Sequence, residues 1–202
     1  MREFRMATNF DRAKCVAAYH EAGHVLGCRI VGTPAVKATI EPTTKNDGHV
    51  LRTKLVTWED SALISYMGRA AELEFGYKDN HWGSYMDYED AEKELREDMR
   101  LQKCKAWSAR TGIWNRLNGR KTTVYTASNI NPRTRWENGK PVDMVRDWKK
   151  SVRVIKKEIQ PTINCLRRKA RRLAKKHRDY IEQVAKLLME HGTLTDEEIP
   201  QL

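Results

Sequence analysis

The segment His20-Glu21-Ala22-Gly23-His24 fits the pattern H-E-x-x-H and constrains this chain more than any other segment. On a helix, side chains four residues apart lie on one face, about 5–6 Å from each other. Both imidazole rings can therefore reach a single Zn²⁺ ion. Glu21 would lie beside the ion, where a carboxylate can take a proton from a water molecule that attacks a carbonyl group. The pattern predicts metal ligands at His20 and His24 and a catalytic base at Glu21.

Apolar, helix-compatible residues flank this pattern at 15–19 and 25–31, which favours a helix from about residue 11 to Val31. Gly32-Thr33-Pro34 should end that helix. The alternative is that two histidines merely share a helical face without a metal. A buried polar group without a partner costs about 1–3 kcal/mol, and a metal ion would supply the partner. We therefore favour a zinc site.

Extended patterns follow the zinc-motif helix. Residues 36–40 alternate between apolar and polar side chains, residues 41–48 are typical of a turn, and 49–56 resume the extended pattern. This order predicts a β-hairpin. The edge of the hairpin can pair with an extended peptide through main-chain hydrogen bonds, or the hairpin can simply pack over the helix.

The remaining patterns are mostly helical. Thr57-Trp58-Glu59-Asp60 has the form of a capping box and opens a helix that Gly76 should close. Pro161 should kink or end a helix that starts at Pro141. Further helices are expected from Ser84 and from about Ile163, and Gly192 should stop the second of them. The predicted fold class is mainly α, with one small β-hairpin after the zinc-motif helix.

A catalytic zinc site usually has three protein ligands and a water molecule, so another part of the chain must supply the third ligand. The acidic region between Glu72 and Asp98 is the most suitable source. For Asp87 a second interpretation exists, because with Ser84 it forms an S-x-x-D box at a helix start, where an acid is favoured anyway. The candidates from this region are Glu72, His81, Asp87, Glu89 and Asp90.

The segment Ala18–His24 is similar to the zinc motif of the FtsH-type proteases, the membrane-anchored AAA+ metalloproteases. Other segments resemble that family in the same order. They are Thr39-Ile40-Glu41-Pro42 with Gly48, Gly68-Arg69-Ala70-Ala71-Glu72 with Phe75-Gly76, Gly83-Ser84-Tyr85-Met86-Asp87 with Ala91, and Leu187-Leu188-Met189-Glu190 with Thr193-Leu194, Glu198 and Ile199.

The resemblance implies a zincin-like helical peptidase domain that hydrolyses peptides or unfolded proteins, with assembly into a homo-oligomer as a further expectation. It assigns the third zinc ligand to Asp87 and makes Glu72 a partner of a histidine N–H or of a helix salt bridge. The chain departs from the family at Thr43, where the family has Arg, and at Met86, where it has Asn. It contains no G-x-x-x-x-G-K-[ST] phosphate loop, so the expected activity is independent of ATP.

On this basis we expect three segments. Residues 1–102 would form the zinc-binding peptidase core, residues 103–140 an irregular, Trp-containing insert or loop, and residues 141–202 basic C-terminal helices that pack on the core.

The net charge of +11 is concentrated near the C-terminus. From Lys149 to Arg178 there are 13 Lys and Arg residues and one acidic residue, Glu158. Such a surface can bind nucleic acid or another anionic partner, or it can be a solvated helical face. The alternative function is therefore a zinc-stabilised binding or regulatory module whose basic C-terminal helix contacts such a partner.

The four cysteines are scattered and form no C-x-x-C pair, which is typical of reduced interior residues in an intracellular protein. Cys28 lies one turn beyond His24, but we expect it in the core rather than at the metal. No apolar run approaches the roughly 20 residues of a membrane span, and the N-terminus has no signal-peptide pattern. We expect a cytoplasmic protein without a membrane span.

Overall fold

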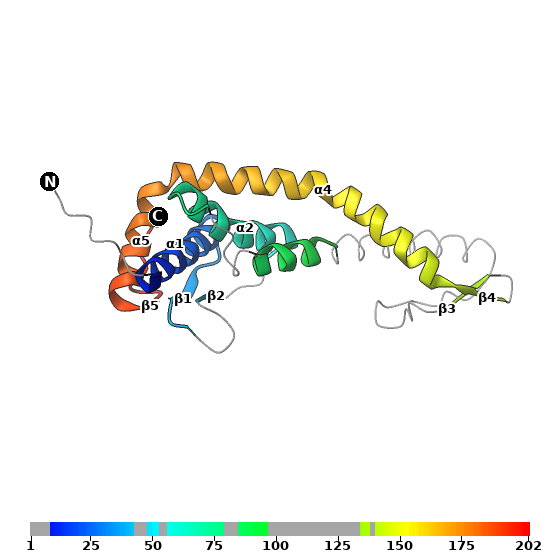
Figure 1. The fold of residues 1–202 in the computed structure, drawn as a ribbon, viewed down its shortest axis with the longest axis horizontal. Coiled ribbons are helices and arrows are strands. Elements are labelled where there is room, and N and C mark those ends of the chain that lie inside the picture. The colour runs from blue at the N-terminus through cyan, green and yellow to red at the C-terminus, as the bar shows by residue number, and fades with distance from the viewer. Residues whose placement is uncertain (1–8, 43–47, 53–55, 79–84, 97–133, 138–139) are drawn as a thin grey trace. The chain divides into compact units, whose positions relative to one another are not determined.

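The computed structural model describes residues 9–42, 48–52, 56–78, 85–96, 134–137 and 140–202 (Figure 1). Two compact units can be distinguished, residues 1–94 with 164–202, and residues 95–163. The helices are α1 (Asn9–Ile30), α2 (Trp58–Glu74), a helical segment over 85–96, α4 (Met144–Lys176) and α5 (Arg178–His191). The strands are β1 (Ala35–Thr39), β2 (His49–Arg52), β3 (Thr134–Glu137), β4 (Lys140–Asp143) and β5 (Thr193–Thr195).

In the first unit, α1 packs against both α2 and α5 (Figure 1). Its buried apolar residues are small or aliphatic, and His20, Glu21 and His24 are buried as well. A Cβ atom at Gly23 would lie 2.5 Å from the carbonyl oxygen of Met67, and one at Gly27 would lie 3.1 Å from Cα of Ile64. Glycine costs a helix about 1 kcal/mol relative to alanine, but here it lets the backbones of α1 and α2 approach closely. The two glycines, four residues apart, therefore bring α2 against the zinc-motif helix.

The sheet of this unit has the strand order β2-β1-β5, and both pairings are antiparallel. The β1–β2 pair confirms the predicted hairpin. The third strand, β5, was not predicted from the sequence. β5 follows Gly192, whose φ of 73° suits glycine. Thr193 of β5 pairs with Thr39 of β1, and their hydroxyl oxygens lie 2.7 Å apart. The first unit is thus mainly helical with one small, three-stranded antiparallel sheet.

The predicted ends of two helices agree with the structure. α1 ends at Ile30 and is followed by Gly32, which has a φ of 74°. Thr57 caps α2, because its hydroxyl oxygen accepts a hydrogen bond of 3.1 Å from the backbone N–H of Asp60. Local residue chemistry therefore determines where these helices begin and end.

Other sequence predictions were wrong in part. Pro161 was predicted to kink or end its helix, and it does not end it, because α4 continues through Pro161. The long helix predicted from Ile163 until Gly192 is interrupted at His177. The segment from Pro141 to Asp143 belongs to β4, which pairs with β3, and the helix begins only at Met144.

Cys28 is buried as expected, whereas Cys165 is exposed. Most of the predicted irregular segment 103–140 lies outside the described residues.

Within the described part of the chain, no helix combines the length and the apolar character that crossing a membrane would require.

Candidate metal centre

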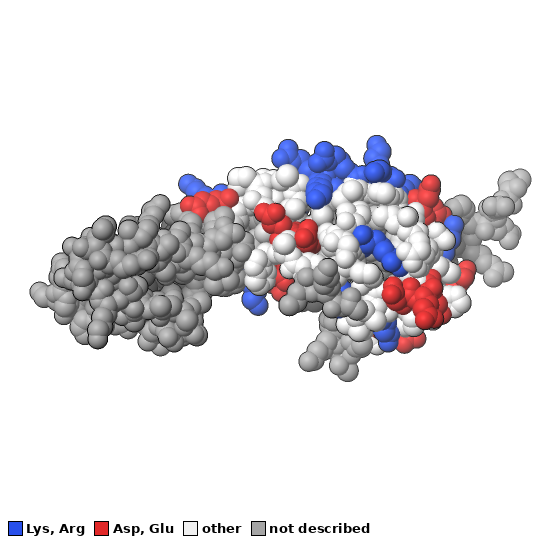
Figure 2. All heavy atoms as spheres, turned by 180° about the vertical axis from the view of Figure 1, so that it is seen from behind, with Lys and Arg blue, Asp and Glu red and all other residues white. Residues whose placement is uncertain are grey.

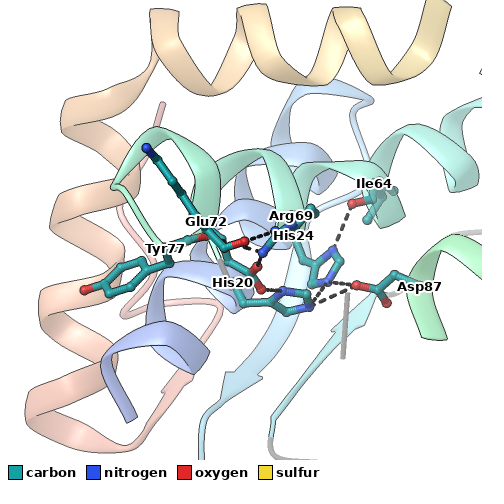
Figure 3. Close-up of polar contacts among 8 residues, drawn as sticks. His20, His24, Ile64, Arg69, Glu72, Tyr77 and Asp87 are labelled. Atoms are coloured by element: carbon teal, nitrogen blue, oxygen red, sulfur yellow. Dashed lines mark hydrogen bonds and ion pairs between the residues drawn. The ribbon is translucent and has the colours of Figure 1, made fainter. Parts of the chain in front are cut away.

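Helix α2 holds both histidine rings of α1 by their Nδ1 atoms (Figure 3). Nδ1 of His20 lies 2.6 Å from Oε1 of Glu72, and Nδ1 of His24 lies 2.8 Å from the carbonyl oxygen of Ile64. Both acceptors come from α2, which the close α1–α2 packing brings within reach. With Nδ1 donating in each ring, both Nε2 atoms are left as acceptors or metal ligands.

The two Nε2 atoms and Asp87 converge on one point. Nε2 of His20 lies 2.9 Å from Nε2 of His24, and Oδ2 of Asp87 lies 2.9 Å from the first and 3.1 Å from the second. Donor atoms that surround zinc tetrahedrally at about 2.0 Å are roughly 3.3 Å apart. The observed triangle is within a few tenths of an ångström of that spacing. Two imidazole nitrogens and one carboxylate oxygen are also a donor set that suits zinc.

Glu72 is itself held in place. It is fully buried, and its second oxygen, Oε2, accepts a hydrogen bond of 2.5 Å from Nη1 of Arg69. The guanidinium group of Arg69 also donates to the carbonyl oxygens of Tyr77, at 3.3 Å, and Lys78, at 2.9 Å. A buried charge is tolerated when it is paired and hydrogen-bonded, as here. The Arg69–Glu72 pair therefore fixes the orientation of the His20 ring.

Gly68 and Gly48 lie directly against the candidate site. A Cβ atom at Gly68 would lie 2.7 Å from Nε2 of His24 and 2.8 Å from Cε1 of His20. A Cβ atom at Gly48 would lie 2.7 Å from Oε1 of Glu21. Side chains at these positions would displace the histidine rings or the Glu21 carboxylate. The glycines thus leave room for the site between α1, α2 and the start of β2.

Burial and charge act together on the titrating groups. Burial raises the pKa of Glu21, and the two histidines lower it only in part. Burial lowers the pKa of His20, but hydrogen bonds with Asp87 and Glu72 outweigh burial and raise it to about 10. Burial also opposes ionisation of Asp87, yet the two histidines hold its pKa well below the ordinary value. Glu21 therefore has the raised pKa that is typical of a carboxylate in acid–base catalysis.

The other sequence candidates for a third ligand lie elsewhere. Glu72 contacts His20 through Nδ1, the nitrogen that faces away from Asp87. Glu89 accepts a hydrogen bond of 2.8 Å from the hydroxyl group of Tyr85, and Asp90 is exposed. His81 lies outside the described residues.

Sequence reasoning did not identify Ile64 or Arg69 as parts of this arrangement. The Ile64 contact is made by a backbone carbonyl, which carries no side-chain signal. The sequence did contain a signal for Arg69. An arginine three residues before a glutamate on a helix can form an i,i+3 ion pair, as Arg69 and Glu72 do.

We compared the chain with protein-family models and with curated proteins, and neither comparison gives a match.

Proposed function

We propose that the chain is an ATP-independent zinc metalloendopeptidase with a zincin-like, FtsH-type peptidase fold. The observation that carries the proposal is the approach of two Nε2 atoms and Oδ2 of Asp87 to within 2.9–3.1 Å of one another. Glu21 follows His20 directly in the sequence, and the residue is only 5% exposed. The similarity of the motifs around His20, Gly68 and Asp87 to those of FtsH-type proteases also supports it.

His20, His24 and Asp87 would hold the ion. Zinc, when bound, supplies a Lewis acid that polarises the scissile carbonyl and makes water more acidic. Glu21 accepts a proton from the attacking water while the new carbon–oxygen bond forms. It then donates that proton to the amine nitrogen as the carbon–nitrogen bond breaks. Burial raises the pKa of Glu21, which favours the protonated form that the second step requires.

The edge of β2 is a suitable place for the substrate main chain. In the described part of the chain, β2 pairs with β1 and with no other strand, so its outer edge has backbone groups available to an extended peptide. The residue that precedes this strand, Gly48, lies against the Glu21 carboxylate. A peptide added along β2 would therefore run past the proposed base. Since only an extended chain can pair in this way, we propose peptides and unfolded proteins as substrates.

Glu21→Gln tests the role of the base. This change keeps the size of the side chain and removes its ability to carry a proton. We expect about one zinc ion per chain, as in the wild type, and a decrease of about 10²-fold or more in cleavage of an unfolded protein such as casein. Glu190→Gln, at an exposed position of α5, is the matched control and should retain full activity. Wild-type activity in Glu21→Gln would remove Glu21 from the mechanism.

A further inference from the structure

The C-terminal part of α4 has an entirely basic solvent face. Leu166, Ala170 and Ala174 are buried against the body of the first unit. The exposed charged side chains between Asn164 and Lys176 are all positive. We call this surface the basic face, and it consists of Arg168, Lys169, Arg171, Arg172, Lys175 and Lys176. Figure 2 shows Lys and Arg gathered over α4 along one edge of the molecule.

Two neighbouring arginines belong to the fold instead. Nη2 of Arg167 lies 3.2 Å from Oε1 of Glu92, and its guanidinium group lies 4.5 Å from the ring centre of Tyr88. Arg178 pairs with Glu74 at 3.0 Å. These contacts hold α4 and α5 against the rest of the unit. We therefore do not count Arg167 and Arg178 as part of the basic face.

The basic face differs from an ordinary solvated helix. Such helices usually mix both signs, as α5 does where Lys186 pairs with Glu182 at 2.8 Å. No acidic residue occurs between Ile159 and Arg178. Among the residues that the structure describes, no carboxylate forms an ion pair with the basic face. Like charges at i,i+3 and i,i+4 destabilise a helix slightly, so a polyanion bound there would relieve repulsion.

We propose that the basic face binds the phosphate backbone of double-stranded nucleic acid. From Arg168 to Lys176 the helix rises by about 12 Å. Duplex DNA carries one negative charge per about 1.7 Å of its axis, or roughly seven over that length. Six cations on nine residues match this charge density closely. Because phosphate contacts carry no base information, the binding is independent of sequence.

The surface composition favours a duplex over the other polyanions. Single-strand binders stack bases on aromatic side chains, and the basic face has none. Helices that lie in a membrane surface insert large apolar residues. Among the residues whose exposure the structure describes, the exposed large apolar side chains all lie outside the basic face, namely Val36, Leu51, Trp58, Tyr85, Met86 and Leu202.

The experiment is a salt titration of binding to a fluorescein-labelled 20-base-pair DNA duplex of arbitrary sequence, followed by anisotropy, with the full chain. Four to six phosphate contacts predict that log K falls with log salt concentration with a slope of about −3.6 to −5.4. In the triple variant Arg168→Gln, Arg172→Gln, Lys175→Gln, we expect the slope to become less steep by about 2.7 and binding at 50 mM salt to weaken by at least about 10-fold.

The matched control makes the same change in charge at exposed lysines of other helices, with Lys14→Gln, Lys93→Gln and Lys186→Gln. Its affinity for the duplex should be within about twofold of that of the wild type. Helix content by circular dichroism, measured on both variants, checks the fold. Equal loss of binding in both triple variants, no binding of the wild type at 20 mM salt, or tighter binding to phosphatidylserine vesicles than to the duplex would overturn the proposal. The result is independent of the proposed peptidase activity, because neither triple variant changes a residue of the candidate metal centre.

Discussion

Nδ1 of His20 and Oε1 of Glu72 lie 2.6 Å apart in the buried interface between α1 and α2. This contact orients the ring so that Nε2 faces Asp87, and Arg69 holds the glutamate in place from the other side. The arrangement resembles the carboxylate–histidine pairs that orient ligands in zinc proteins. The geometry of the candidate metal centre thus depends on a residue that does not itself face the proposed ion.

Glu72→Gln should weaken zinc binding without removing a ligand. The amide cannot accept as strong a hydrogen bond from the ring, and its NH₂ group faces either Arg69 or His20 unfavourably. We expect the zinc dissociation constant, measured by competition with a chelator, to rise by about 10–100-fold. Glu74→Gln, which removes the partly buried carboxylate partner of Arg178, is the control and should leave the constant unchanged. An unchanged constant in Glu72→Gln would show that this contact does not support the metal.

The metal-free chain should lose stability as pH rises above neutral. The pKa of His20 in the folded chain is about 10, above its ordinary value of 6.5. Its stabilising contribution is therefore complete below pH 6.5 and is lost as pH rises through 10. We choose the range from pH 7 to 8.5 because it lies below the ordinary pKa of cysteine and tyrosine. Within this range we expect the free energy of unfolding to fall by about 1 kcal/mol per pH unit.

Urea denaturation in the presence of a chelator measures this effect. His20→Gln should show a shallower dependence on pH over the same range, and equal dependence in both proteins would contradict the assignment. The pH dependence of zinc affinity should have the opposite sign. A histidine must be neutral to bind the metal, so zinc affinity should rise with pH.

The sequence predicted the local parts of this fold well. The spacing of His20 and His24, the capping residue Thr57 and the glycine after α1 each act within a few residues, so their consequences can be read from the chain. The hairpin was also predictable, because its strands are neighbours in sequence. Asp87 could be proposed by resemblance, and the structure brings it to the two histidines although it lies 63 positions after His24 in the sequence.

The remaining features depend on contacts between distant segments. Strand β5 has only three residues, and its pairing with β1 joins positions about 150 residues apart. Gly23 and Gly27 appear unfavourable in a helix until α2 is placed against them. Pro161 lies inside α4, although a proline within a helix removes a backbone hydrogen bond and usually kinks or ends the helix. Such features require the tertiary structure.

The central claim is that His20, His24 and Asp87 together hold one zinc ion. Its most direct test is elemental analysis of purified wild type, His20→Ala, Asp87→Ala and Asp90→Ala after dialysis against a weak chelator. Asp90 is exposed and lies one turn beyond Asp87, so Asp90→Ala is the control. The account predicts about one zinc per chain in the wild type and in Asp90→Ala, and almost none in His20→Ala and Asp87→Ala. Full zinc content in Asp87→Ala, or a wild type that retains no metal, would contradict it.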